Sequence, residues 1–376
     1  MSDGCEASSD DLLQELEQMR ASPGTPAVDH ERLVRWARAA RAEAPPPLAT
    51  GPVEPPGSSD IDLPPEAGSA AEEQARARGR DSLRAGELAF VVLAGGMATR
   101  MGGVVKALVD ALPGRSFLNL RLEQQEAGAA RGFQVPLWLM TSHATDEAIR
   151  RELGPRLRGD ELATFTQDAS LRLTPEGGLF RDAEGRAQPY ATGHGDLPDA
   201  LRRSGLLDRF LERGGRTLLI ANLDNLAASV DEVLLGWHLG HGGPLTVELV
   251  AKQPGDRGGG PVRTGGRTVL LEDVRLPAGF DSASVPYFST NTFWADAAAL
   301  AGLKFDWTYA RVEKRVDDRV AIQFERILNE LTSALPARYL LVPRSGARGR
   351  FLPVKDQQEL ASRRPEIEQL MRGLGA

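Results

Sequence analysis

The stretch FVVLAGGMATRMGGVVK occupies residues 90–106. It starts as a short apolar run, breaks at Gly95 and Gly96, and continues through Arg100 and two more glycines to Lys106. The apolar run is typical of a buried parallel strand. The glycines let the backbone turn sharply, and the free N–H groups of such a turn bind anions. With the two added cations, the stretch predicts a strand followed by a nucleoside-triphosphate site.

Two common phosphate-binding motifs do not fit this stretch. In a Walker P-loop the lysine follows a glycine and precedes Ser or Thr, whereas Lys106 lies between Val105 and Ala107. The dinucleotide fingerprint requires a third glycine at a spacing that is not found here. A plain strand-to-helix turn is the alternative for this segment taken alone.

Composition narrows the class of protein. The chain has 376 residues, of which 41% are apolar and 26% charged, as in globular proteins. Its net charge of −7 argues against nonspecific nucleic-acid or anionic-membrane binding. Cys5 is the one cysteine, the N-terminus lacks signal-peptide features, and no apolar run approaches the ~20 residues of a membrane span. We expect a cytoplasmic protein.

The first 86 residues differ from the rest. Helices with apolar faces are expected at 10–19 and 30–44, and many prolines follow up to residue 65. We expect an N-terminal helical segment at 1–44, a Pro-rich linker or strap at 45–86, and one large α/β domain at 87–376. The helices form either a cap on that domain or a disordered tail, and their apolar faces favour the cap.

Strands and helices alternate from residue 87 onward. Strands are expected at 89–93, 137–141, 217–221, 245–251, 268–271 and 339–342. Helices are expected at 116–130, 146–153, 197–204, 231–240, 320–335 and 356–372, with Ser116 and Thr145 capping the first two. This alternation predicts a mostly parallel sheet covered on both faces, with ligands at the carboxyl ends of its strands.

Further motifs follow along the chain. They are FTQ at 165–167, GHGD at 193–196, ANLDNL at 221–226, VELVAK at 247–252, GG at 258–259, FSTNTFW at 288–294, VPRS at 342–345 and RFLPVK at 350–355. Together with the opening stretch, and in the same order, they resemble the UTP–glucose-1-phosphate uridylyltransferase (UDP-glucose pyrophosphorylase) family over roughly residues 89–360.

The resemblance implies a fold and a reaction. The fold would be an α/β, Rossmann-like nucleotidyltransferase fold of the GT-A-like kind, with a mixed, mostly parallel central sheet and catalytic residues in the domain at 87–376. The reaction would form UDP-glucose and pyrophosphate from UTP and glucose 1-phosphate with Mg²⁺. Alternatives are the same chemistry on galactose or N-acetylglucosamine 1-phosphate, or a nucleotide-sugar-binding regulator without catalysis. The GHGD motif favours glucose.

The resemblance also implies the phosphate-binding groups. Lys106 and Lys355 align with family lysines that contact phosphate. Arg100 is expected to face the triphosphate, because its segment also resembles bacterial sugar nucleotidyltransferases. Uridylyl transfer brings two polyanions together, so cations and Mg²⁺ are expected to do most of the catalysis. Asp224 is the best candidate ligand for Mg²⁺. For each cation, a solvated surface charge is the alternative.

The remaining expected substrate contacts are also carried by the resemblance. They are Leu93, Ala94, Gly95, Gly96, Gln167, Gly193, His194, Asn222, Leu223, Asp224, Glu248 and Asn291. Gln167 would pair with uracil, because an amide both donates and accepts. His194 would contact phosphate or sugar, whereas Asp196 is expected to cap the helix from residue 197.

Three departures from the family pattern bear on specificity and assembly. Ala94 replaces an asparagine in the nucleoside segment. Ser289 and Thr292 replace asparagines beside Asn291, which puts the identity of the sugar in doubt. Eukaryotic members continue into a C-terminal β-helical domain, whereas 356–376 suffices for one helix. We therefore expect a monomer or weak dimer.

Overall fold

The computed structural model describes residues 12, 14–16, 27–41, 51–98, 101–316 and 318–375. The chain divides into two compact units. The first unit comprises Met1–Pro47, Gln167–Leu197 and Asp306–Leu328, and the second comprises Leu48–Thr166, Pro198–Phe305 and Asn329–Ala376. The domain boundaries expected at residues 44 and 86 stay predictions.

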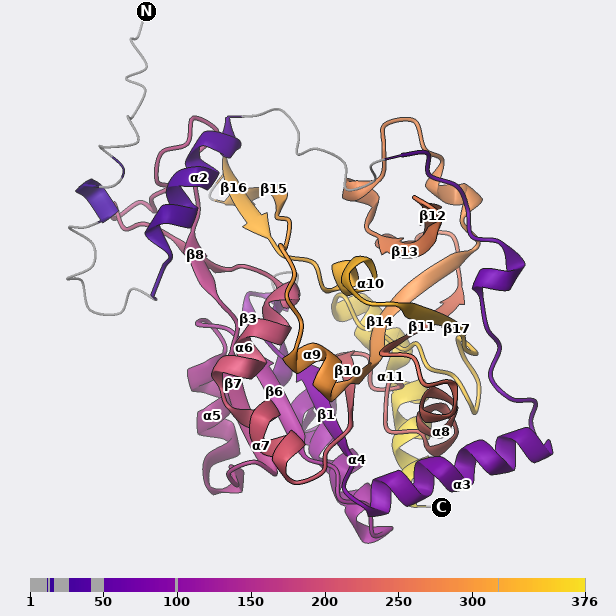
Figure 1. The fold of residues 1–376 in the computed structure, drawn as a ribbon. Helices are drawn as coiled ribbons and strands as arrows, with labels where there is room; N and C mark the ends of the chain where they lie inside the picture. Colours follow the sequence, from indigo (N-terminus) through magenta and orange to yellow (C-terminus); the bar gives the residue numbers. More distant parts are fainter. Residues whose placement is uncertain are drawn as a thin grey trace, which may run out of the picture. The chain divides into compact units, whose positions relative to one another are not determined.

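A seven-stranded sheet forms the centre of the second unit (Figure 1). Its order is β17 (Ala337–Leu341), β11 (Leu245–Ala251), β14 (Tyr287–Asp296), β10 (Thr217–Asn222), β1 (Leu88–Leu93), β6 (Leu137–Thr141) and β7 (Leu162–Thr166). Neighbouring strands run parallel except where β14 pairs antiparallel with β10 and β11. The expected mixed, mostly parallel α/β sheet is confirmed.

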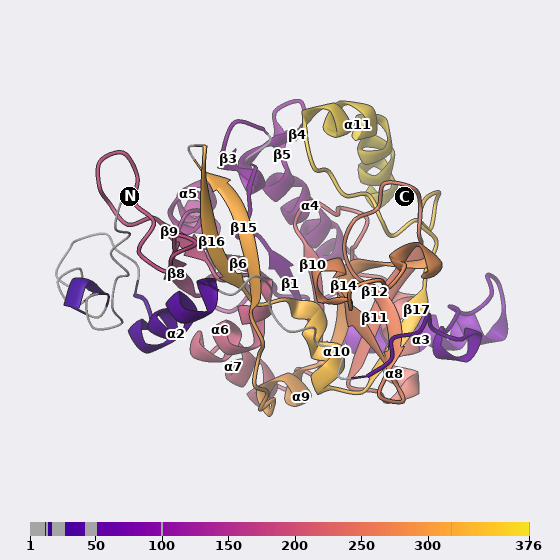
Figure 2. The same ribbon diagram turned by 90° about the horizontal axis from the view of Figure 1, so that it is seen from above.

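Helices cover both faces of this sheet, as Figure 2 shows. α4 (Phe117–Ala130), α5 (Asp146–Leu153) and α11 (Gln357–Arg372) lie on one side, and α7 (Leu206–Glu212) and α9 (Ala297–Ala301) lie on the other. The remaining helices of this unit are α6 (Leu197–Arg203), α8 (Glu232–His241) and α10 (Leu331–Ala334). Strands such as β1 and β10 are buried on both faces, which explains their nearly continuous apolar sequence.

The two expected helix caps have different outcomes. Ser116 caps α4, because its hydroxyl accepts a hydrogen bond from the backbone N–H of Asn119 at 3.2 Å. Thr145 makes no cap hydrogen bond, so that prediction was wrong. Its Oγ1 instead accepts from the N–H of Ser142 at 3.0 Å and donates to the carbonyl of Ala94 at 3.2 Å.

The helix expected at 320–335 is wrong over most of its length, because only α10 lies within that range. Residues 319–325 form β16 (Arg319–Glu325), which pairs antiparallel with β15 (Ala310–Val316). The segment RVAIQFE is rich in β-branched and aromatic side chains, and these pack well on a pleated surface. Tyr190 also fixes this strand: its hydroxyl accepts from the N–H of Phe324 at 2.8 Å.

A helix that we did not expect lies within the Pro-rich segment. Residues 70–84 form α3 (Ala70–Arg84), which packs closely against α8 (Figure 1). A Cβ on Gly79 would lie 1.9 Å from the carbonyl oxygen of Glu232, and one on Gly236 would lie 1.7 Å from that of Ala75. Glycine on both helices therefore allows this crossing. Upstream, Asp62 forms a bridge with Leu340 at the outer edge of β17.

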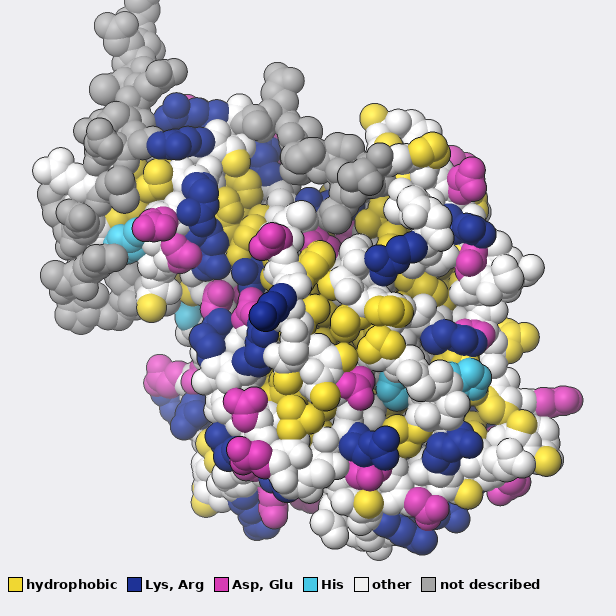
Figure 3. Space-filling view, viewed as in Figure 1, with side chains coloured by type: hydrophobic (Ala, Val, Ile, Leu, Met, Phe, Trp, Pro, Cys, Tyr) yellow, Lys and Arg dark blue, Asp and Glu magenta, His cyan; other side chains and the backbone are white. Residues whose placement is uncertain are grey.

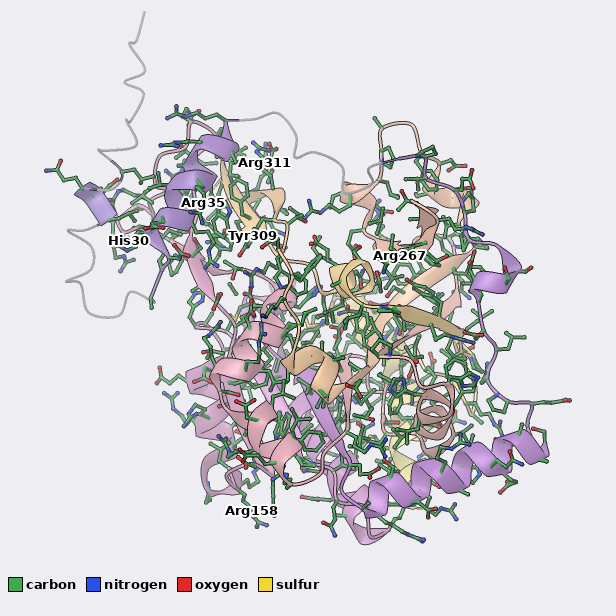
Figure 4. The ribbon with its side chains drawn as sticks, viewed as in Figure 1. His30, Arg35, Arg158, Arg267, Tyr309 and Arg311 are labelled. Carbon is green, nitrogen blue, oxygen red and sulfur yellow. The ribbon has the colours of Figure 1, made fainter. Side chains whose placement is uncertain are left out.

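The first unit is built around α2 (His30–Ala40), the β8–β9 pair (Ala169–Leu171 and Pro189–Ala191) and the β15–β16 hairpin. The expected helix near residue 30 is confirmed, and Asp29 caps it. Trp36 stacks on Phe324 with ring centroids 5.2 Å apart and meets Tyr309 edge-on at 4.6 Å. Figure 4 shows Tyr309 beside α2, which carries His30 and Arg35.

Other expectations concern the termini and the surface. Of the helix expected at 10–19, Leu12 and Leu16 are buried, and most of the remainder lies outside the described residues. In the part of the chain that the structure describes, no helix is long and apolar enough to cross a membrane. Acidic and basic side chains are interspersed over the face drawn in Figure 3, in keeping with the mixed charge of the sequence.

Candidate active site

The turn that follows β10 joins segments far apart in the sequence. β10 ends at Asn222, which lies beside Leu93 at the carboxyl end of β1. Asp224 follows in the turn, and its Oδ2 accepts from Nζ of Lys106 at 2.7 Å. The same oxygen accepts from the backbone N–H of Val354 at 3.2 Å. One carboxylate thus receives a lysine from the glycine-rich segment and the backbone of the RFLPVK motif.

A second side chain of the turn fixes the RFLPVK motif. Nδ2 of Asn225 donates to the carbonyl of Arg350 at 3.1 Å, and Oδ1 accepts from the N–H of Leu352 at 2.8 Å. Lys355 therefore follows a backbone segment that is attached to the turn at three points. Its side chain is exposed, and the next residue, Asp356, caps α11 by accepting from the N–H of Glu359.

Side chains of the loop after β6 bind the backbone at the start of the glycine-rich segment. Oγ of Ser142 donates to the carbonyl of Gly95 at 2.9 Å, and Thr145 holds that of Ala94. Ala94 is buried in the core, so its side chain offers nothing to a ligand. Residues 97–98 and 104–105 then pair as the short strands β2 and β3, which leads the chain back to Lys106.

The glycines of this segment differ in backbone conformation and in packing. The left-handed conformations occur at Gly102 (φ 89°) and Gly103 (φ 72°). A Cβ on Gly96 would meet no atom within 4 Å, so packing alone does not require glycine there. Arg100 lies outside the described residues.

Asn291 lies opposite Asn222 because β14 is irregular there. The register of β11 with β14 shifts between Glu248 and Leu249. Asn291 adopts φ 56°, which asparagine tolerates better than most residues. Its Nδ2 donates to Oδ1 of Asn222 at 2.9 Å, while its own Oδ1 is buried without a hydrogen-bond partner in the described structure. The two expected substrate-binding asparagines are therefore in direct contact.

Glu248 and Leu223 have buried side chains. The carboxylate of Glu248 accepts from Nε1 of Trp294 at 2.8 Å and from Nε and Nη2 of Arg350 at 2.9 and 2.8 Å. Both of its oxygens are engaged, so this geometry favours support of Arg350 over a direct sugar contact. Leu223 packs in the hydrophobic core, and its backbone N–H donates to the carbonyl of Leu93 at 3.2 Å.

Gln167 and His194 belong to the first unit. Oε1 of Gln167 is buried without a hydrogen-bond partner among the described residues. Nδ1 of His194 lies 3.0 Å from the backbone N–H of Leu328 and accepts from it, which places the proton of the neutral ring on Nε2. Burial lowers the pKa of His194 to about 4. At neutral pH this histidine is an uncharged donor.

The glycines around His194 have a packing role within the first unit. Gly193 adopts φ 105°, and a Cβ there would lie 2.4 Å from the carbonyl oxygen of Arg326. A Cβ on Gly195 would lie 2.7 Å from the Cβ atom and 2.8 Å from the carbonyl carbon of Arg326. The backbone of Arg326 therefore requires both glycines, with or without a ligand.

Asp196 does not cap the helix that follows it, contrary to expectation. Its Oδ2 accepts from the hydroxyl of Thr192 and from the N–H of Asp168 at 3.2 Å. Burial, with a smaller contribution from the negative charge of Asp168, raises the pKa of Asp196 to about 6. Nη1 of Arg326 lies 3.4 Å from Oδ1 of Asp196, so this carboxylate connects its own segment with those of Asp168 and Arg326 in the first unit.

Glu272 is a candidate that the sequence reasoning missed. It follows β13 (Arg267–Leu271), and its Oε1 accepts from Nδ2 of Asn329 at 2.6 Å. A Cβ on Gly259 would lie 3.0 Å from the same oxygen. Burial raises the pKa of Glu272 to about 7. The sequence feature that could have pointed to this contact is the glycine pair at 258–259, because Gly259 lets the carboxylate of Glu272 approach the backbone closely.

Comparison with known proteins decides the family. A sequence model of the UTP–glucose-1-phosphate uridylyltransferase family matches residues 59–373. The chain belongs to this family. The enzyme of that name from Encephalitozoon cuniculi is 30% identical over 288 residues, which cover 73% of this chain. The chain spans 57% of the length of that relative.

Solved structures of similar proteins support the fold. A UDP-glucose phosphorylase from Trypanosoma brucei superposes with a TM-score of 0.74 and 23% identity, covering 94% of this chain and 78% of the other. A uridine diphosphate N-acetylglucosamine pyrophosphorylase from the same organism gives 0.68 at 21% identity, covering 84% and 72%. The uridylyltransferase family fold is thus shared with relatives named for different sugars.

Proposed function

We propose that this chain transfers a uridylyl group from UTP to glucose 1-phosphate and forms UDP-glucose and pyrophosphate. One observation carries the proposal. Oδ2 of Asp224 accepts hydrogen bonds both from Nζ of Lys106 and from the backbone N–H of Val354, the residue before Lys355. These groups come from three motifs of a family whose members catalyse this reaction. A structural turn alone would not need a lysine and a carboxylate from segments so distant in the sequence.

The reaction joins two polyanions. A phosphate oxygen of glucose 1-phosphate attacks the α-phosphorus of UTP, a new P–O bond forms, and the bond to the bridging oxygen of pyrophosphate breaks. The nucleophile is already an anion and needs no strong base. Catalysis then depends on cations placed where negative charge accumulates. Lys106 and Lys355 would supply these charges.

The pair of Lys106 and Asp224 fits this task in the free protein. Each neutralises the other at 2.7 Å, and both side chains remain partly exposed, at 22% and 13%. A triphosphate oxygen would compete with Asp224 for the ammonium group. Lysine suits such an exchange of partners, because it acts as a compact point charge without a fixed geometry.

A divalent metal, Mg²⁺ in our proposal, would bind the carboxylate of Asp224, which also pairs with Lys106. Among the described residues, no group of three or more His, Cys, Asp or Glu could hold a metal ion. Asp224 alone therefore fits Mg²⁺ bound jointly with substrate phosphates, which is its usual mode in nucleotide sites. When bound, the metal would supply positive charge to the phosphate oxygens.

Other side chains would recognise the substrates. The unpartnered amide oxygen of Gln167 suits the N–H of uracil, and the Nε2–H of neutral His194 suits a phosphate or hydroxyl oxygen. The free Oδ1 of Asn291 would accept from a hydroxyl of the sugar or ribose. Buried polar atoms without partners are costly, so a ligand that satisfies them gains affinity.

A second candidate is the same transfer to a different sugar 1-phosphate. The likeness to an N-acetylglucosamine pyrophosphorylase fold and the substitutions at Ser289 and Thr292 favour testing it. Pyrophosphate release should be measured with UTP and with glucose, galactose and N-acetylglucosamine 1-phosphates. Glucose 1-phosphate should give the highest kcat/KM. Release with none of the three would overturn the enzymatic proposal in favour of a binding protein.

A further inference from the structure

Arg121 lies on α4, directly behind the turn that carries Asn222 and Asp224. Its side chain is 1% exposed, and its guanidinium lies over the ring of Phe90 at 5.3 Å. In the described part of the chain no carboxylate forms an ion pair with it. Burial of a cation without a paired anion is costly unless its N–H groups are hydrogen-bonded.

The hydrogen bonds of Arg121 offset this cost. A guanidinium has five N–H groups, and here each has an acceptor. Nε donates to the carbonyl of Leu223 (3.2 Å), Nη1 to that of Ala228 (3.0 Å) and to Oε1 of Gln124 (2.9 Å), and Nη2 to the carbonyls of Asn222 (2.9 Å) and Asn225 (2.6 Å). Four of the five bonds thus converge on one turn.

The turn has little other regular structure to define it. It begins at Asn222, the last paired residue of β10, and ends before α8. Carbonyl groups that point toward the interior must be satisfied there, because water cannot reach them. Gln124 extends the same support, since its Nε2 donates to the carbonyl of Leu226 at 2.8 Å. With these carbonyls fixed inward, the side chains of Asn222, Asp224 and Asn225 make the contacts described above.

We propose that Arg121 is a positioning residue of the active site, which fixes the 222–228 turn so that Asn222 and Asp224 meet their partners. Arg121 contacts no reacting atom in this account and acts through the turn. The inference rests on the proposed function, because it assigns catalytic roles to that turn. Arg121 keeps its positive charge at neutral pH. Burial lowers the pKa of Arg121 only to about 9, and the negative charge of Asp224 opposes that shift.

The experiment compares Arg121→Lys with Arg202→Lys. Lysine keeps the charge, but its compact ammonium group cannot reproduce the planar fork that reaches four separated carbonyls. Arg202 is the matched control: it also donates to backbone carbonyls, but those of Ala301 and Leu303, which do not belong to the 222–228 turn. Amide hydrogen exchange should become faster in residues 223–228 in the first variant and remain unchanged there in the control. Unchanged exchange in Arg121→Lys would overturn the proposal.

Kinetics then separate positioning from a general loss of stability. Arg121→Lys should lower kcat about 10–100-fold at a temperature where the variant is fully folded. In an Asp224→Asn background the same change should cost less than about 3-fold, because residues that act as a unit are not additive. Equal costs in both backgrounds would refute action through the turn. If Arg121→Lys does not fold, Gln124→Ala replaces it. This variant should also exchange faster in residues 223–228 and lose kcat mainly in the wild-type background, with smaller changes than Arg121→Lys.

These outcomes remain distinct from failure of the proposed function. If the wild-type chain releases no pyrophosphate, the proposed function fails, whereas hydrogen exchange still decides whether Arg121 fixes the turn. If the wild type is active and the turn of Arg121→Lys exchanges faster without loss of kcat, the positioning role fails and the enzymatic proposal stands.

Discussion

Replacing Lys106 by methionine tests the proposed phosphate-binding cation most sharply. The change removes the ammonium group that lies 2.7 Å from Oδ2 of Asp224 and keeps most of the side-chain volume. In the free protein Asp224 retains its hydrogen bond from the N–H of Val354, and its side chain is 13% exposed. The loss of this partly exposed ion pair should cost about 1 kcal/mol or less in folding stability.

The expected effect on turnover is much larger. Loss of one preorganised charged contact to the transition state lowers kcat about 10²–10³-fold, which corresponds to about 3–4 kcal/mol in the barrier. By contrast, about 1 kcal/mol of stability shifts Tm by only a few degrees. We therefore expect Lys106→Met to have a nearly normal melting temperature and severely reduced turnover.

The assay is steady-state pyrophosphate release with saturating UTP and glucose 1-phosphate, beside a melting curve for each protein. Lys314→Met is the matched control, because Lys314 pairs with Glu325 at 3.7 Å on the β15–β16 hairpin and has no proposed catalytic role. The control should keep wild-type kcat. If Lys106→Met retains more than about a tenth of wild-type kcat, or if the control loses as much, the assigned role of Lys106 is refuted.

Three further predictions follow from other groups. Asp224→Asn should raise the Mg²⁺ concentration needed for half-maximal activity, because the amide loses the charge; an unchanged requirement would point to another ligand. Gln167→Ala should raise KM for UTP and narrow the preference for UTP over CTP, and an unaltered ratio would contradict uracil recognition. Burial lowers the pKa of His238 to about 4 from its ordinary 6.5, so stability should be lost as pH falls below about 6.5. Denaturation should be measured at pH 7 and at pH 5. Between these pH values the free energy of unfolding should fall by about 2 kcal/mol less in His238→Gln than in wild type, and an equal fall in both would refute this.

The apolar strands were the predictable part of the fold. The continuous apolar runs of β1 and β10 identify parallel strands, and their positions were confirmed. β14 was missed as a strand because its Ser, Thr and Asn residues interrupt the pattern, and its irregular register depends on Asn291 in a left-handed conformation. α3 was missed because its small buried residues, such as Ala75 and Gly79, leave a weak apolar stripe.

The candidate site was predictable in its location more than in its contacts. The turn after β10 was expected at the carboxyl edge of the sheet, and it lies there. The pairing of Lys106 with Asp224 joins loops 118 residues apart, so no local pattern could supply it. The support from Arg121 was likewise hidden, because an arginine on an amphipathic helix is usually assigned to the solvent-exposed face.

The most direct test of the central claim is ³¹P NMR of the purified chain with UTP, glucose 1-phosphate and Mg²⁺. The account predicts that the signals of UTP and glucose 1-phosphate decline together, while those of UDP-glucose and pyrophosphate rise in equal amounts. The same mixture with Asp224→Asn should change far more slowly. Unaltered substrate signals with the wild-type chain, or orthophosphate without UDP-glucose, would contradict uridylyl transfer.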